Sequence, residues 1–170
     1  MPVDVNEMIF RFSGGTSNTD KDLSYGGDMS STAGPTDNTL HNLFDRVSGA
    51  ENAANTDEVR CLYILNTDAS ITAENVRLWV ESETTHTGED VEIALDLAGL
   101  NGTADTVTDA YTLPSPPVSW TDASGVGSAI AVGNIPAGQK YAFWIKRNTN
   151  NAAAYNDYTT VLKIDWDTAA

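Results

Sequence analysis

Residues 42–66 pass from an irregular polar segment into a strongly apolar run: NLFDRVSGAENAANTDEVRCLYILN. Successive side chains of an extended chain point to opposite faces. Within residues 59–65, one face carries Val59, Cys61, Tyr63 and Leu65, and the other carries Arg60, Leu62 and Ile64. Because both faces are mainly apolar, we expect a central strand that is covered on both sides.

The residues before this run are its expected cover. Residues 13–57 are rich in Gly, Ser, Thr, Asn and Asp, which predicts a series of loops, with a short helical turn at residues 40–47. A contact with another subunit would cover the strand equally well. In that case Arg60, Leu62 and Ile64 would lie in the interface.

Period-two alternation indicates two more strands. Residues 91–97 place Val91, Ile93, Leu95 and Leu97 on one face, as in a strand with one buried side. Residues 76–81 place Val76, Leu78 and Val80 inward and Arg77, Trp79 and Glu81 outward. The segment THTGED between them supplies a turn at Gly88, so we expect the two strands to form a hairpin.

The whole pattern favours an all-β fold. Further strands are expected at residues 8–12, 128–132, 140–147 and 158–166, and no segment shows a convincing amphipathic helix. We therefore expect an antiparallel β-sandwich, immunoglobulin-like or jelly-roll-like. A chain of 170 residues suits a single domain over residues 1–170, with a loop-rich N-terminal part at residues 1–57.

The composition argues against several classes of partner. Nine Lys and Arg residues against 24 Asp and Glu residues give a formal net charge of -15. Such a surface repels phosphate groups, so neither nucleic acid nor an anionic membrane is an expected partner. No window approaches the roughly 18 apolar residues needed to span a bilayer, and the N-terminus lacks the pattern of a signal peptide. A soluble protein is expected.

The residues that usually carry chemistry are few and scattered. His41 and His86 lie outside metal-ligand spacing of any other His or Cys, which argues against a zinc site. Cys61 is expected to be a buried, unreactive side chain. No GxSxG pattern marks a nucleophilic serine. We therefore expect neither an enzyme nor a cofactor.

Three aspartates make the only suggestion of a metal site. Asp20, Asp22 and Asp28 stand among glycines, as in a calcium-binding loop. The segment lacks the spacing and the closing Glu of an EF-hand, and Lys21 lies within it. An ordinary turn is the favoured interpretation, and no bound metal is expected.

Trp79 and Trp144 fall on faces that the alternation predicts to be outward. Three interpretations are open. Loops of the same chain would cover the rings, a protein interface would use them as anchors, or they would stack on sugars together with loop residues such as Tyr155 and Tyr158. The candidate interface residues are Trp79, Trp144, Arg60, Leu62, Ile64 and Tyr155.

Two stretches resemble structural proteins of tailed bacteriophage virions. In residues 42–66, a loop of the form LFDxVxGAExA leads into ExRCxYxxN. Residues 135–164, IPAGQKYAFWIKRNTNNAAAYNDYTTVLKI, resemble the P-G-Q turn, aromatic W-I-x-R strand, Ala-rich loop and closing strand of those proteins. Residues 13–37 show no matching pattern.

The resemblance implies a capsid decoration, or cement, protein. Such a protein binds the major capsid protein on the outer capsid surface of the virion, after synthesis in the host cytoplasm. The resemblance further implies a small homo-oligomer, with a trimer favoured, that contacts the shell through residues 2–22 and the loops at one end of the sandwich. The alternatives are a carbohydrate-binding or host-recognition module, and a tail or baseplate component of a phage particle.

Overall fold

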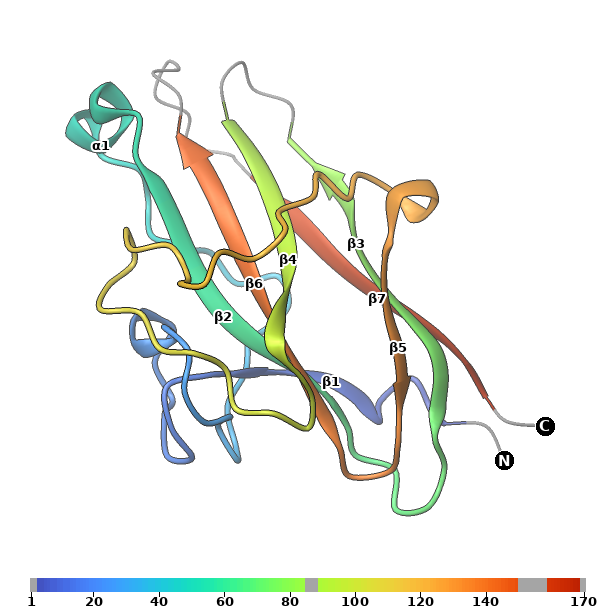
Figure 1. Ribbon diagram of the computed structural model, residues 1–170. Helices are drawn as coiled ribbons and strands as arrows, with labels where there is room; N and C mark the ends of the chain where they lie inside the picture. Colours follow the sequence, from blue (N-terminus) through green and yellow to red (C-terminus); the bar gives the residue numbers. More distant parts are fainter. Residues whose placement is uncertain (1–2, 85–88, 150–158, 169–170) are drawn as a thin grey trace.

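The computed structural model describes residues 3–84, 89–149 and 159–168. Its strands are β1 (Met8–Phe12), β2 (Asp57–Asn66), β3 (Ala73–Glu83), β4 (Glu89–Leu100), β5 (Ile130–Ile135), β6 (Lys140–Thr149) and β7 (Thr160–Thr168). They build two antiparallel sheets that pack against each other (Figure 1). The predicted antiparallel β-sandwich is confirmed.

The strand order interlocks the two sheets. One sheet has four strands in the order β1-β2-β6-β4, and the other has three in the order β5-β3-β7. From β2 onward, successive strands alternate between the sheets. An immunoglobulin domain keeps its strands in the groups ABED and CFG. In this chain, the fifth and sixth strands have exchanged sheets relative to that order.

The predicted hairpin between residues 76–81 and 91–97 is wrong. β3 lies in the three-stranded sheet and β4 in the four-stranded sheet. Alternation shows which side chains face a core, but it does not show which strand is the neighbour. Two strands that face one core from opposite sheets therefore give the same sequence pattern as a hairpin. The expected turn at Gly88 lies outside the described residues.

The inner faces of the two sheets enclose the main core. Its most deeply buried members include Leu62, Ile64, Val76, Leu78, Ile93, Phe143 and Ile145. Strand β2 lies between β1 and β6, with Ile64 opposite Phe10 on one side and Tyr141 on the other. The prediction that residues 59–65 form a central strand is confirmed.

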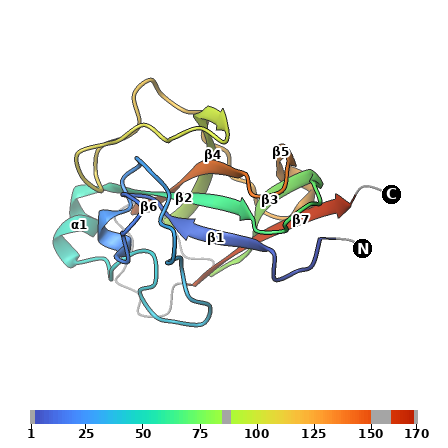
Figure 2. The same ribbon diagram turned by 90° about the horizontal axis from the view of Figure 1, so that it is seen from below.

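The other face of the four-stranded sheet carries a second, smaller core. Its strand residues are Val59, Cys61, Tyr63, Ala94, Ala142 and Trp144. Two loop segments contribute Tyr25, Met29, Ala104, Val107, Val118 and Trp120. One segment precedes β2 and the other joins β4 to β5. Figure 2 shows parts of both segments near α1 (Gly49–Ala54), while the end of the β4–β5 segment hydrogen-bonds to Val80 on β3. The chain therefore covers this sheet with its own loops.

Two glycines allow the N-terminal loops to approach their neighbours closely. A Cβ at Gly34 would lie 2.1 Å from the carbonyl oxygen of Phe10, on β1. A Cβ at Gly26, where φ is +91°, would lie 1.7 Å from the carbonyl oxygen of Asp105. Because any other residue would push these segments apart, the packing of the loops requires glycine at both positions.

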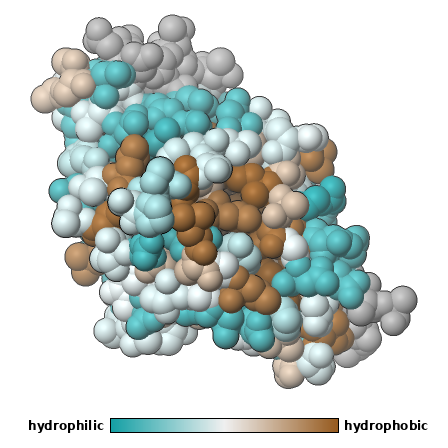
Figure 3. All heavy atoms as spheres, viewed as in Figure 1, coloured by the Kyte–Doolittle hydropathy of each residue, from teal (hydrophilic) through white to brown (hydrophobic). Residues whose placement is uncertain are grey.

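Strand β4 follows the predicted alternation only in its first half. Its register against β6 shifts between Leu95 and Leu100, so the strand bulges there. At this bulge Leu97 is 59% exposed, whereas Asp96, which lies against Trp144 of the second core, is 4% exposed. The expected inward position of Leu97 is therefore wrong. Figure 3 shows hydrophobic residues along the middle of the face that β4 crosses, with hydrophilic residues around them.

The helix begins after the segment where a helical turn was expected. Residues 40–47 form no helix, whereas α1 starts at Gly49. The Ser48 hydroxyl accepts a hydrogen bond from the Glu51 N–H (3.2 Å), and the Glu51 carboxylate accepts one from the Ser48 N–H (2.6 Å). This capping box sets the helix start. Within the described parts of the chain, no helix is both long and apolar enough to cross a membrane.

Candidate functional site

The acidic residues of the N-terminal loop hold the turn itself. Asp20 caps the short 3-10 helix η1 (Lys21–Leu23) by accepting a hydrogen bond from the backbone N–H of Asp22. The Asp22 carboxylate pairs with Lys21 and Arg60. Across residues 3–84, 89–149 and 159–168, no group of three or more His, Cys, Asp and Glu side chains is placed to hold a metal ion.

Cys61 is a packing residue. It lies on β2 with no exposed surface, in the second core. Burial raises the pKa of its thiol far above the ordinary range. Because the thiolate is the reactive form, a nucleophilic role is disfavoured. The predicted burial of Cys61 is confirmed.

A cluster of charged side chains joins the N-terminal loops to β2 and β6. Arg60 on β2 is 2% exposed, and its Nη2 lies 2.8 Å from Glu58 Oε1 and 3.0 Å from Asp22 Oδ1. Arg147 on β6 pairs with the other oxygen of Glu58. Lys21 extends the cluster through contacts of 2.7 Å to both Asp22 and Asp45. We call Lys21, Asp22, Asp45, Glu58, Arg60 and Arg147 the arginine cluster.

Phe44 packs against the arginine cluster. The Cζ atoms of Arg60 and Arg147 lie 5.5 Å and 4.8 Å from the centroid of its ring. The ring of Tyr25 lies 5.2 Å from the same atom of Arg60. Both distances to Phe44 fall within the range of cation–π attraction. Residues 42–47 are therefore held against β2 and β6 by aromatic and ionic contacts.

The charges of this cluster are maintained by their partners. Partial burial opposes ionisation of Asp22, but hydrogen bonds and charges from Lys21 and Arg60 lower its pKa. Burial also opposes the charge on Lys21, yet Asp22 and Asp45 raise its pKa. Both side chains are therefore charged at neutral pH, and the attachment of the loop is ionic.

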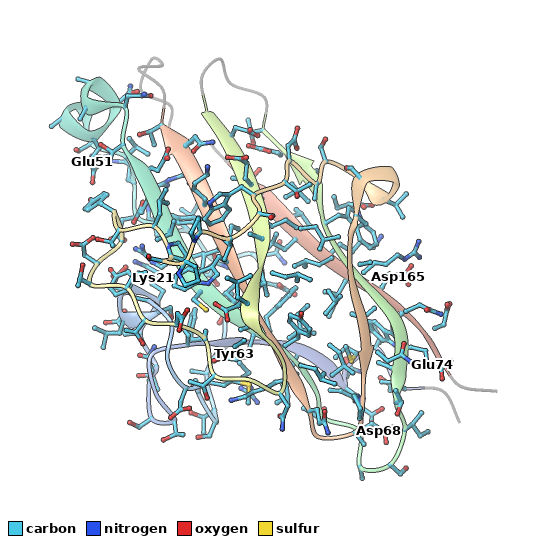
Figure 4. The ribbon with its side chains drawn as sticks, viewed as in Figure 1. Lys21, Glu51, Tyr63, Asp68, Glu74 and Asp165 are labelled. Atoms are coloured by element: carbon cyan, nitrogen blue, oxygen red, sulfur yellow. The ribbon has the colours of Figure 1, made fainter. Side chains whose placement is uncertain are left out.

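Two tyrosine hydroxyl groups connect the loop segments. Tyr63 on β2 donates to the carbonyl oxygen of Gly27 (2.6 Å) and accepts from the N–H of Ala104 (2.8 Å). Tyr111 donates to Glu51 Oε1 (2.7 Å), and this bond raises the pKa of Tyr111 to about 12. The N-terminal loops, α1 and the β4–β5 segment thus form one connected layer, and Figure 4 labels Tyr63 and Glu51 within it.

The two tryptophans singled out in the sequence are covered. Trp144 on β6 has no exposed surface, and its indole N–H donates to Asp96 Oδ2 (2.7 Å). Trp79 on β3 is 3% exposed, its indole N–H donates to Glu81 Oε2 (2.5 Å), and the Lys163 ammonium lies 5.5 Å from its ring centroid. Neither ring offers a surface for a sugar or a protein partner. Covering by the same chain is the interpretation that holds.

The remaining predicted interface residues require a similar correction. Leu62 and Ile64 belong to the main core, and Arg60 lies beneath the N-terminal loops. All three are buried, because both faces of β2 are covered within the chain. The structure therefore does not bring these residues to a surface. Tyr155 and Tyr158 lie outside the described residues.

The N-terminal loops present an open groove of about 690 Å³. It begins beside Phe12 at the end of β1, and four of its ten lining residues are threonines: Thr19, Thr32, Thr36 and Thr39. Leu40, 80% exposed, stands in the sequence between the lining residues Thr39 and Asn42. The lining also includes Asp20 and Lys21, which pair within the N-terminal loop or cap its turn. A polar groove beside an exposed leucine suits contact with another protein surface rather than chemistry.

Sequence reasoning did not find this groove. It forms where residues 12–42 fold back along β1, and no local pattern marks such a return. The SxxE capping box at Ser48 was the local signal for α1. Comparison with known protein families, characterised proteins and solved structures finds no match to this chain. The functional argument therefore rests on the residues themselves.

Proposed function

We propose that this protein is a capsid decoration protein of a tailed bacteriophage, located on the outer capsid surface of the virion. It binds the major capsid protein and stabilises the shell without catalysing a reaction. The observation that carries the proposal is the loop layer, which combines an open threonine-lined groove with the exposed side chain of Leu40.

The residues that resemble phage virion proteins hold the loop layer in place. In residues 42–66, Phe44 packs on the arginine cluster, Arg60 belongs to that cluster, and Cys61 lies in the second core. These residues hold the loops and do not themselves form a contact surface. The resemblance therefore concerns the way in which a set of surface loops is held on a β-sandwich.

The proposal needs a loop surface that keeps its shape on the capsid. Ion pairs, cation–π contacts and the two tyrosine hydroxyl bonds fix the loops before binding occurs. Fixed loops lose less conformational entropy on binding than free ones. Several copies on one shell, or a homo-oligomer such as the expected trimer, would multiply weak contacts.

The direct test is co-sedimentation of the purified protein with mature capsids of its own phage, stripped of accessory proteins. Binding should saturate at a stoichiometry that matches icosahedral symmetry. Absence of binding over a range of salt concentrations would overturn the proposal. Binding to tails instead would favour the baseplate role, and retention on glycans would favour the host-recognition module.

Leu40→Asp tests whether the groove face makes the contact. Burial of a leucine side chain contributes about 1.5–3 kcal/mol, so the variant should bind capsids at least about tenfold more weakly. Val126→Asp is the matched control, because Val126 is also exposed, at 56%, but lies in η2 (Val126–Ser128), before β5. Equal losses for both variants would remove the groove from the proposal.

A further inference from the structure

Three sheet edges are protected or interrupted by the chain itself. At β1, the Phe12 N–H donates to Ala33 O (3.0 Å), and Phe12 O accepts from the Ser30 N–H (2.8 Å). At β4, Ile93 exchanges two backbone hydrogen bonds with Thr121 (3.0 and 2.9 Å). β5 is short, and its register against β3 shifts twice. Such features keep strand edges from pairing with other chains.

The free edge of β7 differs from these three. The strand is nine residues long, ends the three-stranded sheet and pairs with β3 on one side. Among the described residues, no backbone hydrogen bond from another segment reaches its opposite side. A row of backbone N–H and C=O groups at a sheet edge is a template for one more strand.

The side chains of β7 are ordered symmetrically about its middle. Leu162, Ile164 and Trp166 pack against the main core. Lys163 and Asp165, on either side of Ile164, belong to the other face of the strand, with 52% and 48% of their side chains exposed. The middle of β7 therefore carries one positive and one negative charge at equal distances from Ile164.

Contacts with β3 hold both charges in place. Lys163 Nζ lies 3.3 Å from Glu81 Oε1, and Asp165 Oδ2 lies 2.5 Å from Arg77 Nη2. The other carboxylate oxygen of Asp165 accepts a hydrogen bond of 3.0 Å from the backbone N–H of Trp166. The two charges are therefore positioned on the edge strand before any partner arrives.

This order makes β7 complementary to itself. In an antiparallel pair centred on Ile164, Lys163 of each copy stands opposite Asp165 of the other, and Leu162 stands opposite Trp166. A register centred on Lys163 or on Asp165 would place like charges opposite each other, which is destabilising. A shift by one residue would turn the core-facing side of one copy outward. The charge pattern therefore favours the register centred on Ile164 over its neighbours.

We propose that β7 pairs with β7 of a second copy of this chain, antiparallel and centred on Ile164. The two three-stranded sheets then become one continuous sheet across a two-fold axis, a closed arrangement in which both copies use the same surface. The contact is independent of the capsid role, because Asp165 lies on the opposite side of the molecule from Lys21 and the loop layer (Figure 4). It predicts a dimer, whereas the resemblance implies a trimer.

Charge reversal tests the register by sedimentation equilibrium of the full chain. The unmodified protein should be dimeric at micromolar concentration in about 0.15 M salt, where distant charges are screened. Lys163→Asp and Asp165→Lys each oppose like charges at both symmetric positions, so each should weaken the dimer about tenfold. The double variant K163D/D165K restores opposite charges and should regain dimerisation.

The double variant separates pairing from stability. Within one copy, Lys163→Asp faces Glu81 and Asp165→Lys faces Arg77, so the double variant should be the least stable of the four proteins in urea. Regained dimerisation therefore cannot come from regained stability. A monomeric or trimeric unmodified protein, or a double variant that dissociates as readily as the single variants, would overturn the proposal.

Cross-linking tests the same register independently. Lys163→Cys and Asp165→Cys variants, mixed under oxidising conditions, should form a disulfide-linked dimer, because opposed Cβ atoms lie about 5 Å apart in such a pair. Each variant alone should cross-link far more slowly. The native Cys61 is fully buried and should not react. Equal rates for the mixture and the separate variants would contradict a pair centred on Ile164.

Discussion

Arg60 connects residues that are distant in the sequence. Its guanidinium reaches Glu58 on its own strand and Asp22 in the N-terminal loop, and it contacts the rings of Tyr25 and Phe44. Arginine suits this position because its planar group forms ion pairs and aromatic contacts at once. A lysine would retain the charge but lose the planar contacts.

Arg60→Met tests this role. The substitution removes two ion pairs from a side chain that is 2% exposed, so the free energy of unfolding should fall by about 3 kcal/mol. Urea denaturation measures the change. Arg46→Met is the control, because Arg46 is an exposed arginine in the same loop and its loss should change stability by about 0.5 kcal/mol or less. Similar losses in both variants would contradict the assignment.

At the scale of single elements, the bulge in β4 is tied to β6 by one hydrogen bond. Asp96 lies on the same face of β4 as Ala94, towards the second core, and Asp96 Oδ2 accepts the indole N–H of Trp144. Its other oxygen accepts the N–H of Ala98 (2.8 Å). A buried carboxylate is favourable only while such donors remain. The bulge and the tryptophan therefore depend on each other.

Two matched Trp→Phe substitutions test this dependence. Trp144→Phe leaves the buried Asp96 without its indole donor and should cost about 2 kcal/mol. Trp79→Phe removes the same kind of donor from Glu81, whose side chain is 44% exposed and can be hydrated instead, so the cost should stay below about 1 kcal/mol. Hydrogen exchange at Ala98 should accelerate only in Trp144→Phe. Equal costs would contradict the role of the buried acceptor.

At the scale of the whole molecule, three layers are stacked. The three-stranded sheet covers one face of the four-stranded sheet, and the loop residues of the second core cover the other, while Leu43 and Phe44 of the N-terminal loop pack against the main core. The second core holds the loops by apolar contacts, but the ion pairs of the arginine cluster also attach the N-terminal loop to β2, whereas the two sheets are held by the apolar main core. Acid should therefore affect the loop layer before the sheets.

Glu51 provides a test of this difference. The hydrogen bond from Tyr111 lowers the pKa of Glu51 below its ordinary value of 4.5, with further help from Ser48. A lowered carboxyl pKa contributes stability above the unfolded value, and that stability is lost as pH falls through the folded value. The stability advantage of the unmodified protein over Glu51→Gln should be constant above about pH 5 and shrink below about pH 4. Thermal melts across this range measure it, and a constant difference would contradict the prediction.

Local patterns were sufficient for the strands but not for their neighbours. Residues 8–12 and 140–147 were expected as strands and form β1 and β6, because alternation depends only on adjacent residues. The expected hairpin failed, because the pairing of β3 with β7 joins residues far apart in the chain. The exposure of Leu97 could not be foreseen for the same reason, since it follows from the register of β4 against β6.

The sequence alone was enough to establish an all-β sandwich with a central β2 that is covered on both faces. The reason is that the apolar residues of a strand show which of its faces are buried. Only the tertiary structure assigned the cover. It placed Trp144 under loops, Arg60 in an ion-pair cluster and β7 at a sheet edge that no other described segment pairs with. Burial of apolar residues is favourable whichever segment covers them, since the hydrophobic effect is non-directional. Contacts between residues far apart in the sequence determine which segment covers them.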